Sequence, residues 1–156
     1  MAIAITLRQY IESRDVPYEV LTHPHSQSSM ETAQMAHVPG ECLAKCVLLE
    51  DETGYVMAVL PSTHHVRLGA LSKQMQRKLR LAREEELQML FKDCELGAIP
   101  PLGAAYGIDM VVEESLAEKP EVWFEAGDHM RLIHMSGGTF MGMMQNAPRW
   151  RFSEHL

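Results

Sequence analysis

Two apolar runs joined by a tight turn constrain the fold of this chain more than any other feature. Residues 43–49 are apolar on both faces of an extended chain apart from one lysine, and residues 55–60 form a second apolar run. The turn sequence Asp51-Glu52-Thr53-Gly54 lies between them. Such runs pair as a β-hairpin, and a strand that is apolar on both faces belongs inside a sheet. We therefore expect a central hairpin.

Helices and further strands are interspersed around this hairpin. Capping residues and apolar spacing predict helices over residues 6–14 (N-cap Thr6), 28–37 (Ser28 and Glu31 at capping-box spacing), 67–75 and 83–91. Strands are expected over 18–22, 79–81, 109–112, 122–125 and 131–135, with a helical turn over 113–117 and a last helix, capped by Ser136 or Thr139, up to Met144. Without a strict βαβ rhythm, this order predicts an α+β fold, and residues 1–156 suffice for a single domain.

Composition excludes several classes of protein. An apolar fraction of 46% is ordinary for a globular protein, and a net charge of −7 argues against attachment to nucleic acid by bulk electrostatics, though not against a local basic patch. Three cysteines without framework spacing indicate reduced thiols and a cytoplasmic setting. The sequence has no signal-peptide pattern and no apolar run of membrane-spanning length, so we expect no membrane partner.

Lys45 is the one charged residue in the first apolar run. Burying an ammonium group without a partner is costly. The side chain therefore either reaches the surface along its stem or serves a functional site.

The loop Gly97-Ala98-Ile99-Pro100-Pro101-Leu102-Gly103 is the second candidate feature. Two prolines fix two φ angles and remove two donors, so the loop is stiff. It is either a rigid connector or a cradle whose N–H groups, from Gly97, Ala98, Ile99, Leu102 and Gly103, point one way. Aligned N–H groups can hold a carbonyl oxygen or an oxyanion.

Two histidine-containing stretches are weaker candidates. Gly127-Asp128-His129 lies between two apolar runs and is either an ordinary hairpin turn or a polar wall of a site. His23 and His25 would share one face of a strand, as metal ligands can, and His64-His65 is a further pair. No second ligand pair at zinc-like spacing accompanies them, so we expect no metal and no other cofactor.

Six basic residues and no acidic one lie between Arg67 and Arg83. On an acidic protein this is a local positive stretch. It is either a solvated helix face or a contact with nucleic-acid phosphates, which position a substrate without reading its bases. The candidate contacts are Lys73, Arg77, Lys78 and Arg80.

The order of three motifs resembles the YbaK/ProX family of aminoacyl-tRNA deacylases, which are similar to the editing domain of bacterial prolyl-tRNA synthetases. The motifs are Leu43-Ala44-Lys45-Cys46-Val47-Leu48-Leu49, Gly54-Tyr55-Val56-Met57-Ala58-Val59-Leu60-Pro61 and the Gly97–Gly103 loop. The resemblance covers residues 18–144 and implies a compact α+β domain with a mixed, partly barrel-like sheet flanked by helices.

The resemblance also implies a substrate and roles for residues. The substrate would be a mischarged tRNA, with Ala-tRNA-Pro and Cys-tRNA-Pro leading, and an aminoacyl-tRNA synthetase is a further candidate partner; DNA is not expected. Lys45 would lie at the 3′-terminal adenosine and ester. Gly97, Pro100 and Pro101 would form the loop that holds the aminoacyl carbonyl, with Ala98 and Ile99 between them.

Four more residues are carried over as substrate contacts. His129, with Asp128, falls near the last pocket residue of the family. Ser28 and Glu31 open the helix beside the pocket and would be wall residues. The residues themselves offer no Ser/His/Asp or Cys/His set, so we hypothesise hydrolysis by a water molecule that the substrate's own hydroxyl or ribose 2′-OH activates.

Two alternatives remain open. The same fold could bind tRNA or an amino-acid-like ligand without hydrolysis, which a pocket obstructed by large side chains would favour. A small-molecule hydrolase or a metal protein could instead use the histidine-rich stretch. Metal analysis and a test of deacylation separate these alternatives.

Overall fold

A computed structural model describes residues 3–25, 28–144 and 147–156. Its helices are α1 (Ile5–Arg14), α2 (Ser29–Ala36), α3 (Leu68–Met75), α4 (Glu84–Leu90), α5 (Glu114–Ala117) and α6 (Gly137–Gly142), with 3-10 turns η1 (Gly40–Cys42) and η2 (Gly103–Tyr106). Its strands are β1 (Glu19–Thr22), β2 (Leu43–Asp51), β3 (Gly54–Pro61), β4 (His64–Val66), β5 (Arg80–Leu81), β6 (Asp109–Glu113), β7 (Glu121–Glu125), β8 (Arg131–Ser136), β9 (Arg149–Trp150) and β10 (Ser153–His155).

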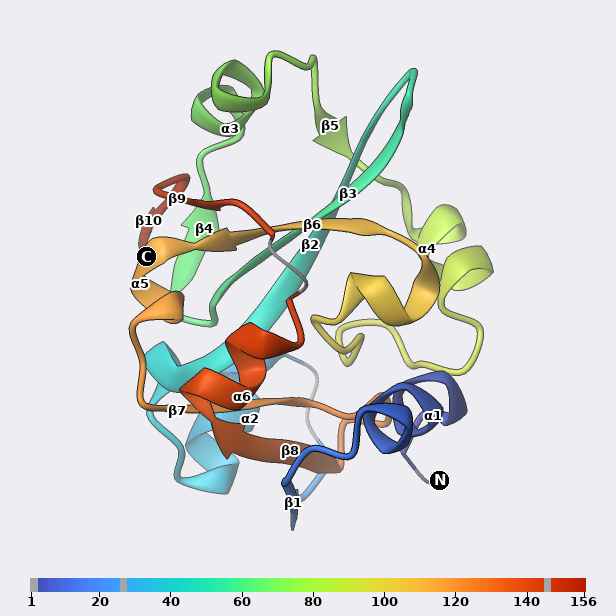
Figure 1. Ribbon diagram of the computed structural model, residues 1–156, viewed down its shortest axis with the longest axis vertical. Helices are drawn as coiled ribbons and strands as arrows, with labels where there is room; N and C mark the ends of the chain where they lie inside the picture. The colour runs from blue at the N-terminus through green and yellow to red at the C-terminus, as the bar shows by residue number, and fades with distance from the viewer. Residues whose placement is uncertain (1–2, 26–27, 145–146) are drawn as a thin grey trace.

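One large mixed sheet with helices around it forms the framework, and the hairpin β2–β3 crosses its middle (Figure 1). The strand order is β1-β8-β7-β2-β3-β6-β9, with β5 paired to β2 off this path. The β2–β3, β7–β8 and β1–β8 pairs are antiparallel, whereas β2–β7, β3–β6 and β6–β9 are parallel. The α+β class and the central hairpin are thereby confirmed.

The side chains of β2 alternate between two parts of the core. Ala44 and Leu48 pack in the largest apolar cluster, together with residues of α1, β3, β6, β7 and β8. Leu49 packs in a second cluster with residues of α3 and the C-terminal segment. Because alternate side chains of a strand point to opposite faces, Lys45 shares the face of Leu49 and lies opposite Cys46.

One edge of β2 is open in its middle. The strand pairs with β7 through Leu43 and Ala44 and with β5 through Leu49 and Glu50, which leaves residues 45–47 without a partner strand on that edge in the described part of the chain. The Leu43 carbonyl oxygen accepts the N–H of Ser62, the residue after β3, whereas the Leu48 carbonyl oxygen accepts the N–H of Ala82 on the other side. By the same alternation, Cys46 directs its backbone N–H and C=O into the opening.

Helix caps agree with the sequence in two places and differ in one. The Oγ of Ser28 accepts the Glu31 N–H at 3.1 Å, and the Oγ of Ser136 accepts the Thr139 N–H at 3.1 Å. The expected Thr6 cap is wrong: α1 starts after Ala4, and Thr6 donates its N–H to Asp93 at 2.8 Å. A carboxylate from a distant segment replaces the local cap.

The C-terminal segment contains strands that the sequence analysis did not predict. β10 pairs antiparallel with β4, which contains the His64-His65 pair. Oε1 of Glu113 accepts the N–H groups of Phe152 and Ser153 at 3.0 and 2.9 Å. The Phe152 side chain is fully buried in the second cluster. One carboxylate and one aromatic ring thus hold an otherwise polar segment.

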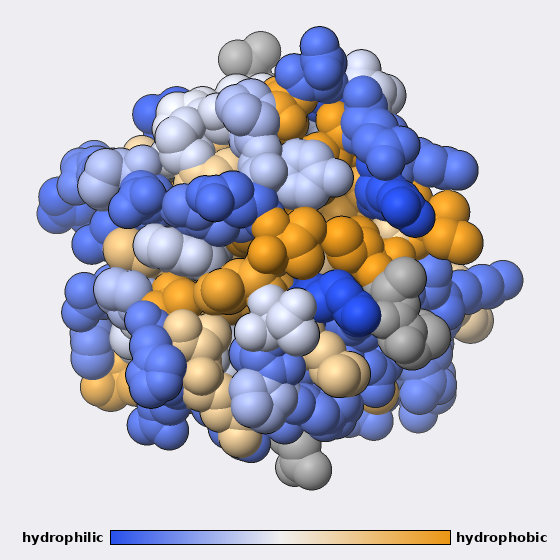
Figure 2. All heavy atoms as spheres, turned by 90° about the horizontal axis from the view of Figure 1, so that it is seen from below, coloured by the Kyte–Doolittle hydropathy of each residue, from blue (hydrophilic) through white to orange (hydrophobic). Residues whose placement is uncertain are grey.

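β1 is an edge strand whose four residues are all exposed. Figure 2 shows the end of the molecule where β1 lies, with an apolar strip running between polar side chains. Val20 and Leu21 are among the exposed large apolar residues of the protein. Among the described residues, none of the helices combines the length and the apolar character that crossing a membrane requires.

Candidate active site

A cavity of about 320 Å³ opens beside the unpaired edge of β2. The residues that line it come from five segments: β2, α4 with its flanks, the proline loop, the end of β7 and the start of α2. They include Ser28, Lys45, Cys46, Leu87, Phe91, Gly97, Ile99 and Glu125. The cavity therefore brings Lys45 and the Gly97 loop together, although Lys45 and Cys46 lie on opposite faces of β2.

Lys45 has no carboxylate partner among the described residues. It is half-buried, and its Nζ donates to the backbone oxygen of Ser62 at 3.4 Å. Burial lowers the pKa of the Lys45 ammonium from its ordinary value. An ammonium group that is partly desolvated and bonded only to a carbonyl is available to an anionic or carbonyl oxygen in the cavity.

The proline loop presents fewer N–H groups than its sequence suggests. Ala98 donates its N–H to Glu95 O at 3.1 Å, and Gly103 donates to the Met110 sulfur at 3.1 Å, so neither points into the cavity. The N–H groups of Gly97 and Ile99 have no acceptor in the described part of the protein, and both residues line the cavity. Leu102 does not line the cavity, so the expectation of five aligned donors is corrected to Gly97 and Ile99.

The two prolines support the loop from behind. Pro100 and Pro101 are buried, and neither they nor Ala98 is among the residues that line the cavity. Gly97 has a φ of +84°, a conformation that side chains disfavour. The prolines therefore fix the backbone, and Gly97 allows its turn toward the cavity.

Asp128 and His129 form the turn between β7 and β8 and do not line the cavity. Asp128 is buried, pairs with Arg131, and accepts the N–H groups of Met130 and Arg131 at 3.0 Å each. His129 Nε2 donates to the backbone oxygen of Leu96. Because Leu96 precedes Gly97, His129 positions the proline loop and lies behind it.

Ser28 lines the cavity next to the start of α2, whereas Glu31 does not. The Ser28 hydroxyl is engaged by the Glu31 N–H, as a helix cap requires. Of this predicted pair, only Ser28 reaches the cavity.

Glu125 and His23 are functional candidates that the sequence analysis missed. Glu125 ends β7 and lines the cavity with a side chain that is 5% exposed. His23 Nε2 lies 3.3 Å from Glu125 Oε1, and the imidazole is fully buried. Burial raises the pKa of Glu125 to about 7, against the opposing effect of Thr32 and the His129 backbone. The sequence signal for Glu125 is a charged residue inside an apolar strand, where burial of the charge is costly. The same signal identified Lys45 as a candidate.

The histidine-rich stretch does not form a metal-ligand cluster in the described residues. β1 ends at Thr22, so His23 and His25 do not share a strand face as expected. His23 contacts Glu125 inside the protein, whereas His25 lies 3.5 Å from Glu95 with an exposed ring.

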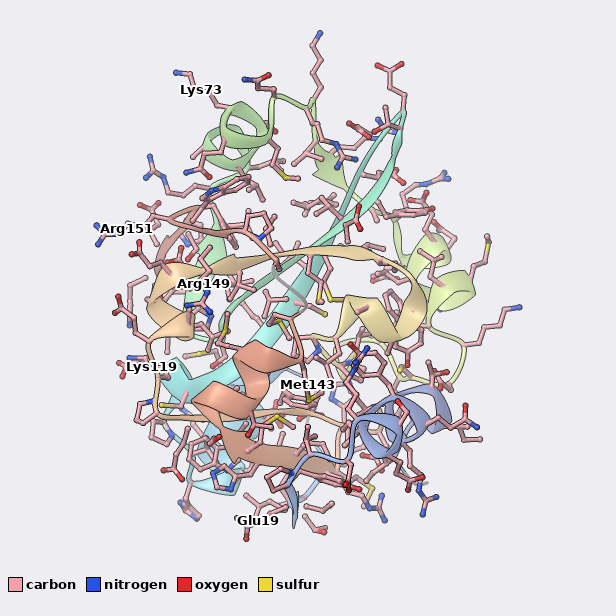
Figure 3. The ribbon with its side chains drawn as sticks, in the orientation of Figure 1. Glu19, Lys73, Lys119, Met143, Arg149 and Arg151 are labelled. Carbon is pink, nitrogen blue, oxygen red and sulfur yellow. The ribbon has the colours of Figure 1, made fainter. Side chains whose placement is uncertain are left out.

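The basic stretch divides into paired and unpaired residues. Arg77 donates two hydrogen bonds to Asp51 at 2.7 and 2.8 Å, and Arg80 pairs with Glu50 at 3.2 Å. Lys73 and Lys78 are exposed, with no ion pair in the described part of the chain. Lys73 points away from α3 into solvent (Figure 3). Of the four candidate contacts, the two lysines are therefore the ones left available for phosphates by the described residues.

The Asp51–Arg77 pair should support stability in a pH-dependent way. The hydrogen bonds from Arg77 hold the pKa of Asp51 well below its usual range. A carboxyl group whose pKa is lowered by folding stabilises the fold at pH values above its unfolded-state pKa of about 3.9. This stabilisation is lost as the pH falls toward the folded-state pKa. We expect Arg77→Gln to lower the Tm at pH 7 and the deficit to shrink below about pH 4. Arg80→Gln, in a more exposed pair, is the control and should change Tm little. An equal Arg77→Gln deficit at pH 7 and pH 3 would contradict the pairing.

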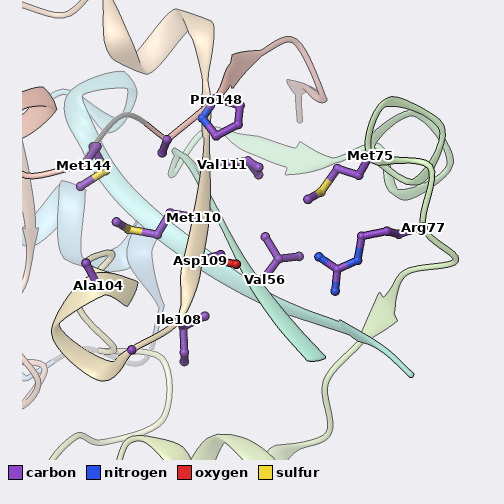
Figure 4. Close-up of a pocket in the computed structure, with 12 residues that line it drawn as sticks. Val56, Met75, Arg77, Ala104, Ile108, Asp109, Met110, Val111, Met144 and Pro148 are labelled. Atoms are coloured by element: carbon purple, nitrogen blue, oxygen red, sulfur yellow. The ribbon is translucent and has the colours of Figure 1, made fainter. Parts of the chain in front are cut away.

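A larger cavity of about 500 Å³ lies beside β6 (Figure 4). Most of its lining residues are of apolar types, and it contains none of the candidate active-site groups except Arg77, whose guanidinium already binds Asp51. The smaller cavity is the better candidate because it combines an unpaired ammonium, free N–H groups and a buried carboxyl group.

Comparison with known proteins identifies the family. The sequence model of the aminoacyl-tRNA editing domain matches residues 23–141, and the chain belongs to this YbaK-like family. A search of curated protein sequences finds no match.

Solved structures share the fold at low sequence identity. A protein provisionally described as a trans-editing enzyme for prolyl-tRNA synthetase is 22% identical, with a TM-score of 0.85 over 97% of this chain and 96% of that one. A chain from work on epitope backbone grafting by computational design onto scaffold proteins is 20% identical, with a TM-score of 0.85 over 97% of both chains. A protein from Marinobacter aquaeolei VT8, provisionally described as a signal transduction protein, is 22% identical, with a TM-score of 0.77 over 97% of this chain and 31% of that one. These likenesses support the mixed α+β fold.

Proposed function

We propose that the protein is a trans-editing aminoacyl-tRNA deacylase that hydrolyses the ester of a mischarged tRNA. The supporting observation is the meeting of three groups at one cavity: the half-buried Lys45 ammonium and the free N–H groups of Gly97 and Ile99. An ester that enters this cavity meets hydrogen-bond donors for its carbonyl oxygen and a cation for its oxygen-rich ribose end. Membership of the editing family supports the same reaction.

The mechanism requires no nucleophilic side chain. Water attacks the acyl carbon, the electron pair of the carbonyl moves to the oxygen, and the N–H groups of Gly97 and Ile99 stabilise the oxyanion that forms. The substrate's own hydroxyl or the ribose 2′-OH takes the proton from the water and passes a proton to the departing ester oxygen. Collapse of the intermediate breaks the ester C–O bond and releases the amino acid and the tRNA hydroxyl. Burial raises the pKa of the Cys46 thiol to about 12, so this cysteine is a poor nucleophile at neutral pH.

The substrates we propose are Ala-tRNA-Pro and Cys-tRNA-Pro. A synthetase rejects a slightly smaller amino acid by only about 1–3 kcal/mol per methylene, so errors of this kind require a second site. The cavity volume of about 320 Å³ is at the small end for ligand pockets, which suits a small aminoacyl group. A deacylation panel of Ala-tRNA-Pro, Cys-tRNA-Pro, Pro-tRNA-Pro, Ser-tRNA-Ala and Ser-tRNA-Thr tests this proposal. Selective hydrolysis of one mischarged species supports it; hydrolysis of none favours the binding module.

We expect Lys73 and Lys78 to contact tRNA phosphates and Arg77 to act in stability alone. A Lys73→Ala, Lys78→Ala double variant should weaken tRNA binding and reduce the slope of log K against log[salt] by about 2, roughly one for each phosphate that is no longer neutralised. Fluorescence anisotropy across a salt series measures this slope. A slope unchanged from wild type would place the tRNA elsewhere on the protein.

A further inference from the structure

The carboxyl group of Glu125 is almost fully buried, close to Thr32, the His129 backbone and His23. Its side chain is 5% exposed, and neither oxygen makes a hydrogen bond of ordinary geometry with the described residues. Buried carboxylates in proteins are nearly always hydrogen-bonded. Glu125 also lines the cavity of Lys45 and Gly97 and is the acidic residue in its wall. Both oxygens are closed to solvent in this structure, so a ligand in the cavity meets them only when the Glu125 side chain turns toward it.

His23 holds the other side of this carboxyl group. Its Nδ1 lies 2.7 Å from the carbonyl oxygen of Pro24, which can only accept, so Nδ1 carries a proton. Nε2 then faces Glu125 Oε1 at 3.3 Å either as a second N–H or as a bare nitrogen. If it is bare, two acceptors face each other unless the carboxyl group is protonated. The His23 contact thus holds Oε1 in place and does not involve Oε2.

The proline loop and the Glu125 strand are tied together at the cavity. Glu95, at the start of the loop segment, donates its N–H to the backbone oxygen of Gly127 at 2.8 Å, and His129 bonds Leu96. These contacts fix the free N–H of Gly97 relative to the end of β7. A ligand with a carbonyl oxygen and a cationic group a few bonds apart could bind the Gly97 N–H through the oxygen and Glu125 through the cation.

We infer that Glu125 binds the α-ammonium group of the aminoacyl ester, with His23 as its positioning residue, and that the substrates are tRNAs whose amino acid has a free α-amino group. This inference rests on the proposed function and deepens it. In a small aliphatic aminoacyl ester the α-ammonium group is the only cation. Two bonds separate the α-carbon, which carries this group, from the carbonyl oxygen. The same cavity then holds the carbonyl oxygen with Gly97 and Ile99 and the ammonium with Glu125.

The test compares alanyl-tRNA with lactyl-tRNA, in which a hydroxyl replaces the ammonium at almost constant size. Rates are expressed as enhancements over spontaneous hydrolysis, because the two esters differ in intrinsic lability. Glu125→Gln keeps the shape and removes the charge. Because a hydrogen bond to a charged group is strong, we expect kcat/KM for alanyl-tRNA to fall about 10- to 100-fold and that for lactyl-tRNA to stay within about threefold.

Glu121→Gln is the matched control, since Glu121 lies on the same strand, is 57% exposed and pairs with His134. It should leave both rates unchanged. An equal loss for both esters in Glu125→Gln would assign Glu125 a purely structural role, and no loss for either would remove it from the site. Both results overturn the inference.

Binding separates this inference from the proposed function. If the wild-type protein hydrolyses neither ester, the proposed function fails, and calorimetry with the stable amides 3′-alanylamino- and 3′-lactylamino-3′-deoxyadenosine still tests Glu125. The inference expects the Glu125→Gln protein to lose affinity about 10- to 100-fold for the alanyl amide alone. Equal affinities of wild type and variant for the alanyl amide, or no binding to the wild type, would overturn it.

Discussion

Replacement of Lys45 by alanine should reduce deacylation of the cognate mischarged tRNA about 100-fold or more, because it removes the cation at the cavity where negative charge develops. The side chain is half-buried, bonded only to the carbonyl oxygen of Ser62, and lines the cavity that Gly97 and Ile99 share. Since phosphates elsewhere on the tRNA supply most of the affinity, tRNA binding should remain close to that of wild type. Single-turnover deacylation and anisotropy measure the two effects separately.

Two further variants separate the charge of Lys45 from its packing. Lys45→Met keeps the apolar stem and should be as inactive as Lys45→Ala, because the ammonium carries the effect. Lys92→Ala removes an exposed lysine away from the cavity and should retain full activity. Full deacylation by either Lys45 variant would contradict the proposed role.

Gly137→Ala should cost the protein several kcal/mol of stability, about 3 or more, through overpacking against rigid backbone. A Cβ atom built on Gly137 would overlap the Lys119 backbone oxygen, far inside any real contact. Gly137 also donates its N–H to Pro120 O at 2.8 Å, so the backbone cannot move away without losing this bond. Urea unfolding of the purified variant measures the loss.

The neighbouring glycine provides the control for this prediction. A Cβ on Gly138 meets nothing within 4 Å, and the residue lies in the same helix α6. Gly138→Ala should be neutral or slightly stabilising, since alanine favours a helix over glycine. Equal stabilities of the two variants would contradict the close approach of α6 to the Lys119–Pro120 segment.

The parts of the fold that could be predicted from the sequence depend on local physics. The hairpin β2–β3 follows from two apolar runs and a turn, and the Ser28 cap follows from a hydroxyl three residues before Glu31. The pairing of β4 with β10 could not be predicted, because both strands are short and polar and their partners are distant in sequence. The same holds for Thr6, whose N–H bonds Asp93 across 87 positions.

The site shows the same division. Lys45 could be predicted from the cost of burying a charge, and Gly97 from the stiff double-proline loop that it begins. Both residues line the cavity. The use of the Ala98 and Gly103 N–H groups within the loop depends on Glu95 and Met110 and was not predictable from composition. Glu125 was overlooked although the argument used for Lys45 applies to it, because its partner His23 lies far away in sequence.

The most direct test of the central proposal is the release of alanine from Ala-tRNA-Pro by the wild-type protein, beside Pro-tRNA-Pro, in water enriched in ¹⁸O. The account predicts release well above the spontaneous rate for Ala-tRNA-Pro alone, one ¹⁸O atom in the alanine carboxylate from water attack at the acyl carbon, and an intact tRNA that can be charged again. Spontaneous rates for both substrates, while the protein still binds the tRNA, would contradict hydrolysis and leave the binding module as the function of this fold.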